Sequence, residues 1–149
     1  MNRRSVLSTA ALLPFLAPAV LAQSGDALPP MSTITFPPGS KTATVSGHLS
    51  PGGRFPYYVA AKAGQTLSVS ANSGTVTITF QVFRPDTVLS RGADGMAQAR
   101  GRTLPDAGPT DNARAWIGAI PQDGNYLILI AMAPGTGTPA PYTLTVALQ

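Results

Sequence analysis

The sequence contains no cysteine, which excludes a disulfide framework and a cysteine nucleophile. It also lacks glutamate and has a single histidine, His48. Catalysis by a serine or threonine nucleophile needs a nearby base. His48 lies inside a strand-like stretch, and we interpret it as a solvent-facing strand residue rather than as a catalytic base. No G-x-S-x-G motif is present, so we expect a protein that is not an enzyme.

Acidic residues are few and all are aspartates. Asp106 and Asp111 share the stretch PDAGPTDN, and could form a carboxylate pair for hydrolysis or, with Asn112, bind calcium. No D-x-D-x-D-G loop occurs, and Asp or Asn beside Gly and Pro commonly caps its own backbone in a turn. Turn formation is the favoured interpretation, and we expect neither a cofactor nor a bound metal.

The net charge is only moderately positive. Ten basic and six acidic residues give +4, and two of the basic residues, Arg3 and Arg4, lie at the N-terminus. The chain has no lysine run and no mixed aromatic and basic patch of the kind that contacts nucleic acid. Nucleic acid is therefore not an expected partner.

The N-terminal stretch MNRRSVLSTAALLPFLAPAVLAQ is typical of a signal peptide. Its apolar run over residues 6–21 is too short and too interrupted by proline to span a membrane. RRSVL fits the twin-arginine export motif, with an ordinary secretory signal as the alternative. We expect cleavage after Ala22, which would remove residues 1–22 and leave residues 23–149 in the periplasm or outside the cell, with no membrane span.

Short stretches rich in Val, Ile, Thr, Tyr and Phe alternate with Gly and Pro through the rest of the chain, which is typical of an antiparallel sandwich or barrel. The predicted strands are 33–36, 42–49, 55–61, 66–71, 76–83, 114–120, 126–133 and 142–148. The run YLILI at 126–130 is apolar throughout and predicts a central strand covered on both faces. We predict an all-β protein with one jelly-roll-like β-sandwich domain over residues 23–149 and a loose arm at 23–31.

Alternation at period two predicts which side chains share a face. In VTITFQVF, Phe80 falls on one face with Val76, Ile78 and Val82, and we expect Phe80 to belong to the core. The last predicted strand repeats the pattern. Its residues on one face are Tyr142, Leu144, Val146 and Leu148.

Residues 84–113 show no strand pattern and are expected to form one long irregular loop, with one or two helical turns at 93–100. Long loops on rigid β-scaffolds often carry function. The arginines of this region suit an acidic partner, because guanidinium groups form forked hydrogen bonds with carboxylates; solvation of a surface loop is the alternative. Trp116 is expected in the core, with stacking on a sugar as the alternative. The arginines are Arg84, Arg91, Arg100, Arg102 and, just beyond the loop, Arg114.

Residues 45–65, VSGHLSPGGRFPYYVAAKAGQ, resemble the periplasmic inhibitors of goose-type lysozyme. In that family an S-G pair, here Ser46 and Gly47, precedes a short loop, an aromatic strand and an A-K-x-G-Q turn, here residues 61–65. The wider order, including the Gly-x-Tyr step at 124–126, is shared with the bacterial pre-peptidase C-terminal type of β-sandwich. One departure is the loop PGGRF, where the family carries tyrosines.

The resemblance implies a secreted binding protein that inhibits a goose-type lysozyme. A lysozyme cleft carries a catalytic carboxylate, so a blocker needs a rigid scaffold that presents a cation or a hydrogen-bond donor. The alternative is a carbohydrate-binding or accessory module of the cell envelope, with cell-wall glycan as the partner. The residues predicted to contact the partner are Ser46, Arg54, Tyr57, Arg91, Arg100, Arg102 and Arg114.

Overall fold

The computed structural model describes residues 28–135 and 137–149, and every regular element in them is a strand. The predicted signal peptide and the first part of the predicted arm lie outside the described residues. No helix in the described part of the chain is long and apolar enough to cross a membrane. The strands are β1 (Ser32–Thr33), β2 (Thr42–Leu49), β3 (Arg54–Ala61), β4 (Thr66–Asn72), β5 (Ile78–Phe83), β6 (Val88–Arg91), β7 (Ala97–Arg100), β8 (Ala115–Ala119), β9 (Gly124–Met132) and β10 (Ala140–Leu148).

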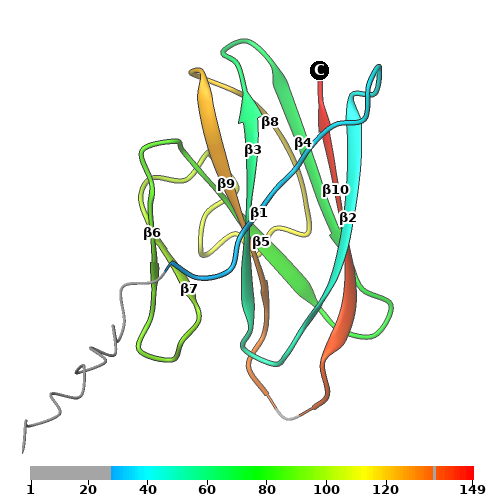
Figure 1. The fold of residues 1–149 in the computed structure, drawn as a ribbon, viewed down its shortest axis with the longest axis vertical. Helices are drawn as coiled ribbons and strands as arrows, with labels where there is room; N and C mark the ends of the chain where they lie inside the picture. Colours follow the sequence, from blue (N-terminus) through cyan, green and yellow to red (C-terminus); the bar gives the residue numbers. More distant parts are fainter. Residues whose placement is uncertain (1–27, 136) are drawn as a thin grey trace, which may run out of the picture.

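Two four-stranded sheets face each other, and a separate hairpin stands beside one of them (Figure 1). Sheet A has the order β1-β3-β9-β5, sheet B has the order β2-β10-β4-β8, and β6 pairs with β7. From β2 to β5, and again from β8 to β10, each strand is followed by one in the other sheet. All pairs are antiparallel except β1 with β3. The predicted sandwich is confirmed, and the predicted strand at 33–36 is present only as the short, parallel β1.

The core lies between the two sheets and is built by alternate residues of each strand. Phe80 is 1% exposed, which confirms its predicted place in the core. Removing such side chains from water is the main stabilising contribution to the fold. The inward residues of β5 and β10 with the lowest exposure are Ile78, Phe80, Val82, Leu144 and Val146.

Two tyrosines bring polar groups into this core. The hydroxyl oxygens of Tyr57 in sheet A and Tyr142 in sheet B lie 2.6 Å apart, and each residue is 4% exposed. One hydroxyl donates to the other, so the pair avoids the cost of burying a hydroxyl without a partner. Burial and this hydrogen bond raise the pKa of Tyr142, because an ionised oxygen would lose its hydration.

Strand β9 is buried on both faces. Tyr126, Ile128 and Ile130 point into the main core, while Leu127 and Leu129 point to the outer face of sheet A. The β6–β7 hairpin lies over that outer face (Figure 1). Its apolar residues form a second cluster with residues of β5 and β9. The prediction of a central strand with two covered faces is confirmed. The second cluster is Phe83, Leu89, Ala97, Leu127 and Leu129.

The prediction of one irregular loop over residues 84–113 is wrong, and so are the helical turns predicted at 93–100. The segment contains the β6–β7 hairpin, whose turn includes Gly95 at φ 78°. Asp94 Oδ1 accepts the N–H of Met96 at 3.0 Å and stabilises this turn. The two strands have only four residues each, too few for alternation to reveal them.

The part of this segment after the hairpin is also ordered by backbone hydrogen bonds. It runs along the edge of β5 that β9 leaves open. The N–H of Phe80 donates to Ala113 O at 2.9 Å, and the N–H of Val82 donates to Ala107 O at 3.0 Å. These bonds close the edge of sheet A and hold residues 101–113 against it.

Candidate functional site on the outer face of sheet A

The seven residues predicted for partner binding lie in three places. Ser46 is exposed on β2 and points away from the core at the outer face of sheet B. Tyr57 is buried between the sheets. The remaining five are exposed arginines on the side of sheet A and the hairpin: Arg54, Arg91, Arg100, Arg102 and Arg114.

Three of these arginines belong to the hairpin or follow it directly, and are called here the hairpin arginines: Arg91, Arg100 and Arg102. Arg91 Nη1 donates to Gly95 O at 3.3 Å within the hairpin turn. Arg102 Nη2 lies 3.4 Å from Asp86 Oδ2, and these side chains are 74% and 54% exposed. An ion pair so open to water contributes little to stability. The hairpin arginines therefore present positive charge to solvent on a well-packed support.

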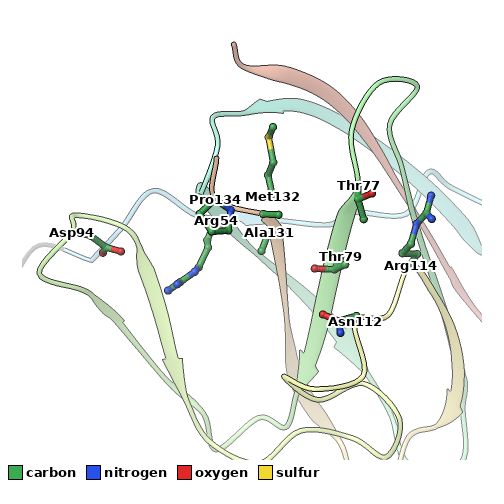
Figure 2. A pocket seen from close by; sticks show the side chains of 11 residues that line it. Arg54, Thr77, Thr79, Asp94, Asn112, Arg114, Ala131, Met132 and Pro134 are labelled. Carbon is green, nitrogen blue, oxygen red and sulfur yellow. The ribbon is translucent and has the colours of Figure 1, made fainter. Parts of the chain in front are cut away.

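The other two arginines border a groove on sheet A. Arg54 on β3 lies opposite Ala131 on β9, which lies opposite Thr79 on β5, so the three form one row across the sheet. A hollow of about 600 Å³ opens over this row, and Figure 2 shows its side chains. We call it the sheet A groove. Its polar lining consists of Arg54, Thr77, Thr79, Asp94, Asn112 and Arg114.

A second hollow of about 350 Å³ adjoins the first at Arg54. It lies between sheet A and β7, and Gln81, Gln98 and Arg100 line it. Arg54 reaches toward the hairpin here, since its Nη1 donates to Ala97 O at 3.4 Å. The two hollows bring Arg54 together with Arg114 on one side and with Arg100 on the other.

The sandwich is similar to solved structures of other proteins. No protein-family model matches the sequence, and no curated protein matches it. Solved structures do match, and three are periplasmic inhibitors of g-type lysozyme named PliG. The fold is that of the PliG inhibitors. PliG of Aeromonas hydrophila has a TM-score of 0.56 and 28% identity, over 80% of this chain and 96% of that chain.

Two further PliG structures are more distant in sequence. PliG of Salmonella Typhimurium has a TM-score of 0.55 and 15% identity, over 80% of this chain and 99% of that chain. A mutant of Escherichia coli PliG has a TM-score of 0.53 and 17% identity, over 79% of this chain and 96% of that chain. At these low identities, the two structures support the shared fold and no shared function. All three neighbours are described as inhibitors rather than enzymes.

The S-G pair of the PliG-like segment has a structural reason. Gly47 of β2 lies opposite Tyr142 of β10, and a Cβ atom on Gly47 would lie 2.6 Å from the Tyr142 hydroxyl. Only glycine leaves room for this tyrosine, which in turn bonds to Tyr57. Two of the residues that carried the resemblance, Gly47 and Tyr57, thus support the core.

The A-K-x-G-Q turn is explained in the same way. Gln65 Oε1 accepts the N–H of Lys62 at 2.7 Å, and Gly64 has φ 87°, a conformation that favours glycine. Asp123 Oδ1 accepts the N–H of Ala63 at 2.8 Å from the neighbouring turn. These residues of the PliG-like motif therefore have structural roles in this chain.

The remaining candidate residues take structural or solvent-facing positions. His48 is exposed on β2. Asp111 Oδ2 accepts the N–H of Gly108 at 2.6 Å, which confirms the turn interpretation for that aspartate. Trp116 is 9% exposed and its Nε1 donates to Pro105 O at 2.8 Å, which confirms the core position over the sugar-stacking one.

Sequence reasoning did not single out the threonines and glutamines that line the two hollows. Thr77, Thr79 and Gln81 alternate with the core residues of their stretch and so share its outer face, but no sequence feature marks that face as the floor of a groove. The groove depends on which strands are neighbours, and only the register of β3, β9 and β5 places Thr79 in a row with Arg54.

Proposed function

We propose that this protein is a secreted, non-enzymatic inhibitor of g-type lysozyme. The observation that carries the proposal is the likeness to Aeromonas hydrophila PliG, at 28% identity and over 96% of that protein's length. The signal-peptide pattern over residues 1–22 supports export to the compartment in which the PliG proteins work.

The hairpin arginines are the proposed contact surface. A lysozyme cleft carries a catalytic carboxylate, and guanidinium groups form strong, directional hydrogen bonds with carboxylates. The hairpin is held on sheet A by Leu89 and Ala97, so it meets the enzyme already ordered and loses little conformational entropy on binding. Arg100, exposed on β7, is the member of the set that we expect to contribute most.

Ser46 and Tyr57 do not belong to this proposed surface. Ser46 lies on the opposite face of the sandwich from the hairpin, and Tyr57 is 4% exposed. Arg54 and Arg114 line the sheet A groove instead. The proposed contact is thus smaller than the set of residues that the sequence suggested.

The test is a lysis assay. Suspended bacterial cell walls are treated with goose-type, chicken-type or invertebrate-type lysozyme, with and without this protein, and the fall in turbidity is followed. We expect selective inhibition of the goose-type enzyme. Lysis by all three enzymes at the control rate would contradict the proposal, and would mean that this protein shares the PliG fold but has another function.

A further inference from the structure

The sheet A groove carries more positive than negative charge. Arg54 and Arg114 are its cations, and Asp94 is its one acid. Asp94 already accepts the N–H of Met96 in the hairpin turn. Within residues 28–135 and 137–149, neither arginine forms an ion pair. Each guanidinium has five N–H donors, so both retain hydrogen-bonding capacity for an anionic ligand.

Between the two arginines the groove is polar but uncharged. In Figure 2, Thr77 and Thr79 lie between Arg54 and Arg114, with Asn112 beside them. Neither threonine hydroxyl bonds to another protein group in the described chain. Hydroxyl and amide groups can both donate and accept, which suits a ligand with many hydroxyls.

The groove also has an apolar border made by residues 132–134, beside Ala131 on its floor. Such a border can contact the C–H face of a sugar ring. The wall that carries Asn112 is ordered, since residue 113 bonds to β5 and the Asp111 carboxylate caps the preceding turn. The site is therefore formed before any ligand arrives, which lowers the entropic cost of binding.

The architecture argues against an extended peptide and against nucleic acid. Strand β9 is paired on both sides, and the outer edge of β5 bonds to Ala107 and Ala113, so a peptide finds no strand edge to join. No aromatic side chain lines the groove, so bases have no stacking platform. Its volume of about 600 Å³ falls within the roughly 300–1,000 Å³ of small-molecule sites.

We propose that the sheet A groove binds a short acidic saccharide. Its carboxylate bonds to Arg54 or Arg114, and its ring hydroxyls bond to Thr77, Thr79 and Asn112. The hairpin forms one wall of this groove through Asp94, but the hairpin arginines do not line it, and the proposal does not depend on lysozyme inhibition.

The test is calorimetric titration of the protein with three matched probes. The first is the disaccharide N-acetylglucosaminyl-N-acetylmuramic acid, which has one carboxylate. The second is N,N′-diacetylchitobiose (called chitobiose below), which lacks that carboxylate, and the third is lactate, which has the carboxylate without the sugar. We expect the acidic disaccharide to bind at least about tenfold more tightly than either control. Equal binding of chitobiose, equal binding of lactate, or no binding of the disaccharide would each overturn the proposal.

Variants locate the site. Arg54→Gln and Arg114→Gln should each weaken binding of the acidic disaccharide about tenfold, because a charge-assisted hydrogen bond is lost. Lys41→Gln removes an exposed cation directly before β2, outside the groove, and should leave the affinity within about twofold. An equal loss of affinity in Lys41→Gln would overturn the assignment, because binding would then depend on the net charge of the protein and not on the groove.

A second measurement works on the unaltered protein. In NMR titration with the acidic disaccharide, the backbone amides of Thr77, Thr79 and Asn112 should show the largest shifts. Shifts confined to sheet B or to the hairpin arginines would place the ligand elsewhere and overturn the assignment of this groove.

Discussion

The outer faces of the two sheets differ, and the difference explains where binding surfaces can form. On sheet A, every residue from Tyr126 to Ile130 is buried, because the hairpin covers the outer face of β9. On sheet B, the outward residues of β2 are polar and exposed, among them Thr44, Ser46 and His48. A strand that is apolar on both faces is stable only when another element buries its outer face. Here that element is the β6–β7 hairpin, which also carries charged residues.

The cover on sheet A is also incomplete. Leu129 is buried beneath the hairpin, but two residues further along the strand Ala131 lies at the floor of the groove. The hairpin therefore does two things at once: it presents arginines outward and it forms one wall of the groove. Among the described residues, no further strand covers the outer face of sheet B.

Truncating a side chain of the inner core should cause the largest loss of stability. Phe80→Ala removes an aromatic ring that is 1% exposed, and we expect a loss of about 3–5 kcal/mol in the free energy of unfolding by urea. The control is Ile117→Ala on β8, where a 69% exposed side chain should change stability by less than about 0.5 kcal/mol. Similar small losses from both variants would show that the inner face of β5 is assigned wrongly.

The second cluster should contribute less to the free energy of unfolding than the core between the sheets. Leu89→Ala is expected to cost about 2 kcal/mol, at the lower end for buried leucine, because the cluster is small and Leu89 lies in a short strand. Hydrogen exchange should become faster first in the amides of β6 and β7. Unchanged exchange there would mean that the hairpin does not depend on this contact.

A pH titration tests the buried tyrosine pair. The pKa of Tyr142 is raised in the folded protein above the ordinary value of about 10. Its contribution to stability is thus complete below pH 10 and is lost as the pH rises above 10, by up to about 1.4 kcal/mol per pH unit. Urea unfolding at pH 9 and pH 11 should show this loss, and Tyr142→Phe should reduce it. An equally steep loss in Tyr142→Phe would assign the effect to other groups.

The hairpin arginines should affect binding and hardly affect stability. The double variant Arg100→Ala with Arg102→Ala removes two exposed side chains and one exposed ion pair, so its melting temperature should stay nearly unchanged. Its inhibition of goose-type lysozyme should fall at least about tenfold, by the loss of charge-assisted bonds. The control is Lys41→Ala with Lys62→Ala, which removes the same charge elsewhere. Unchanged inhibition by the arginine variant would remove the hairpin from the proposed contact.

The fold could be predicted from the sequence wherever strands were long. YLILI indicated a strand with two covered faces, and VTITFQVF indicated which face of β5 enters the core. The β6–β7 hairpin could not be predicted in this way. Its strands have four residues each, and each strand buries only one apolar side chain of the second cluster, which is too short a pattern to show alternation. The one local signal was Asp94-Gly95, a pair typical of hairpin turns.

The candidate site could be predicted less well. The sequence supplied the arginines, but Arg54, Thr79 and Arg114 come from distant parts of the chain. Their meeting depends on strand order and register, which alternation within one strand does not specify. Tyr57 is a different case: the resemblance suggested it as a contact residue, although alternation places it on the buried face of β3 with Val59 and Ala61.

The pairing of Gly47 with Tyr142 has a consequence for how this kind of chain can diverge. A side chain at position 47 would collide with the tyrosine, so position 47 can accept one only after position 142 has become smaller. The two positions should change together during descent, in that order. A chain that keeps both residues keeps the hydrogen-bonded contact between the two sheets whatever it binds, so Gly47 reports on the core and not on a binding partner.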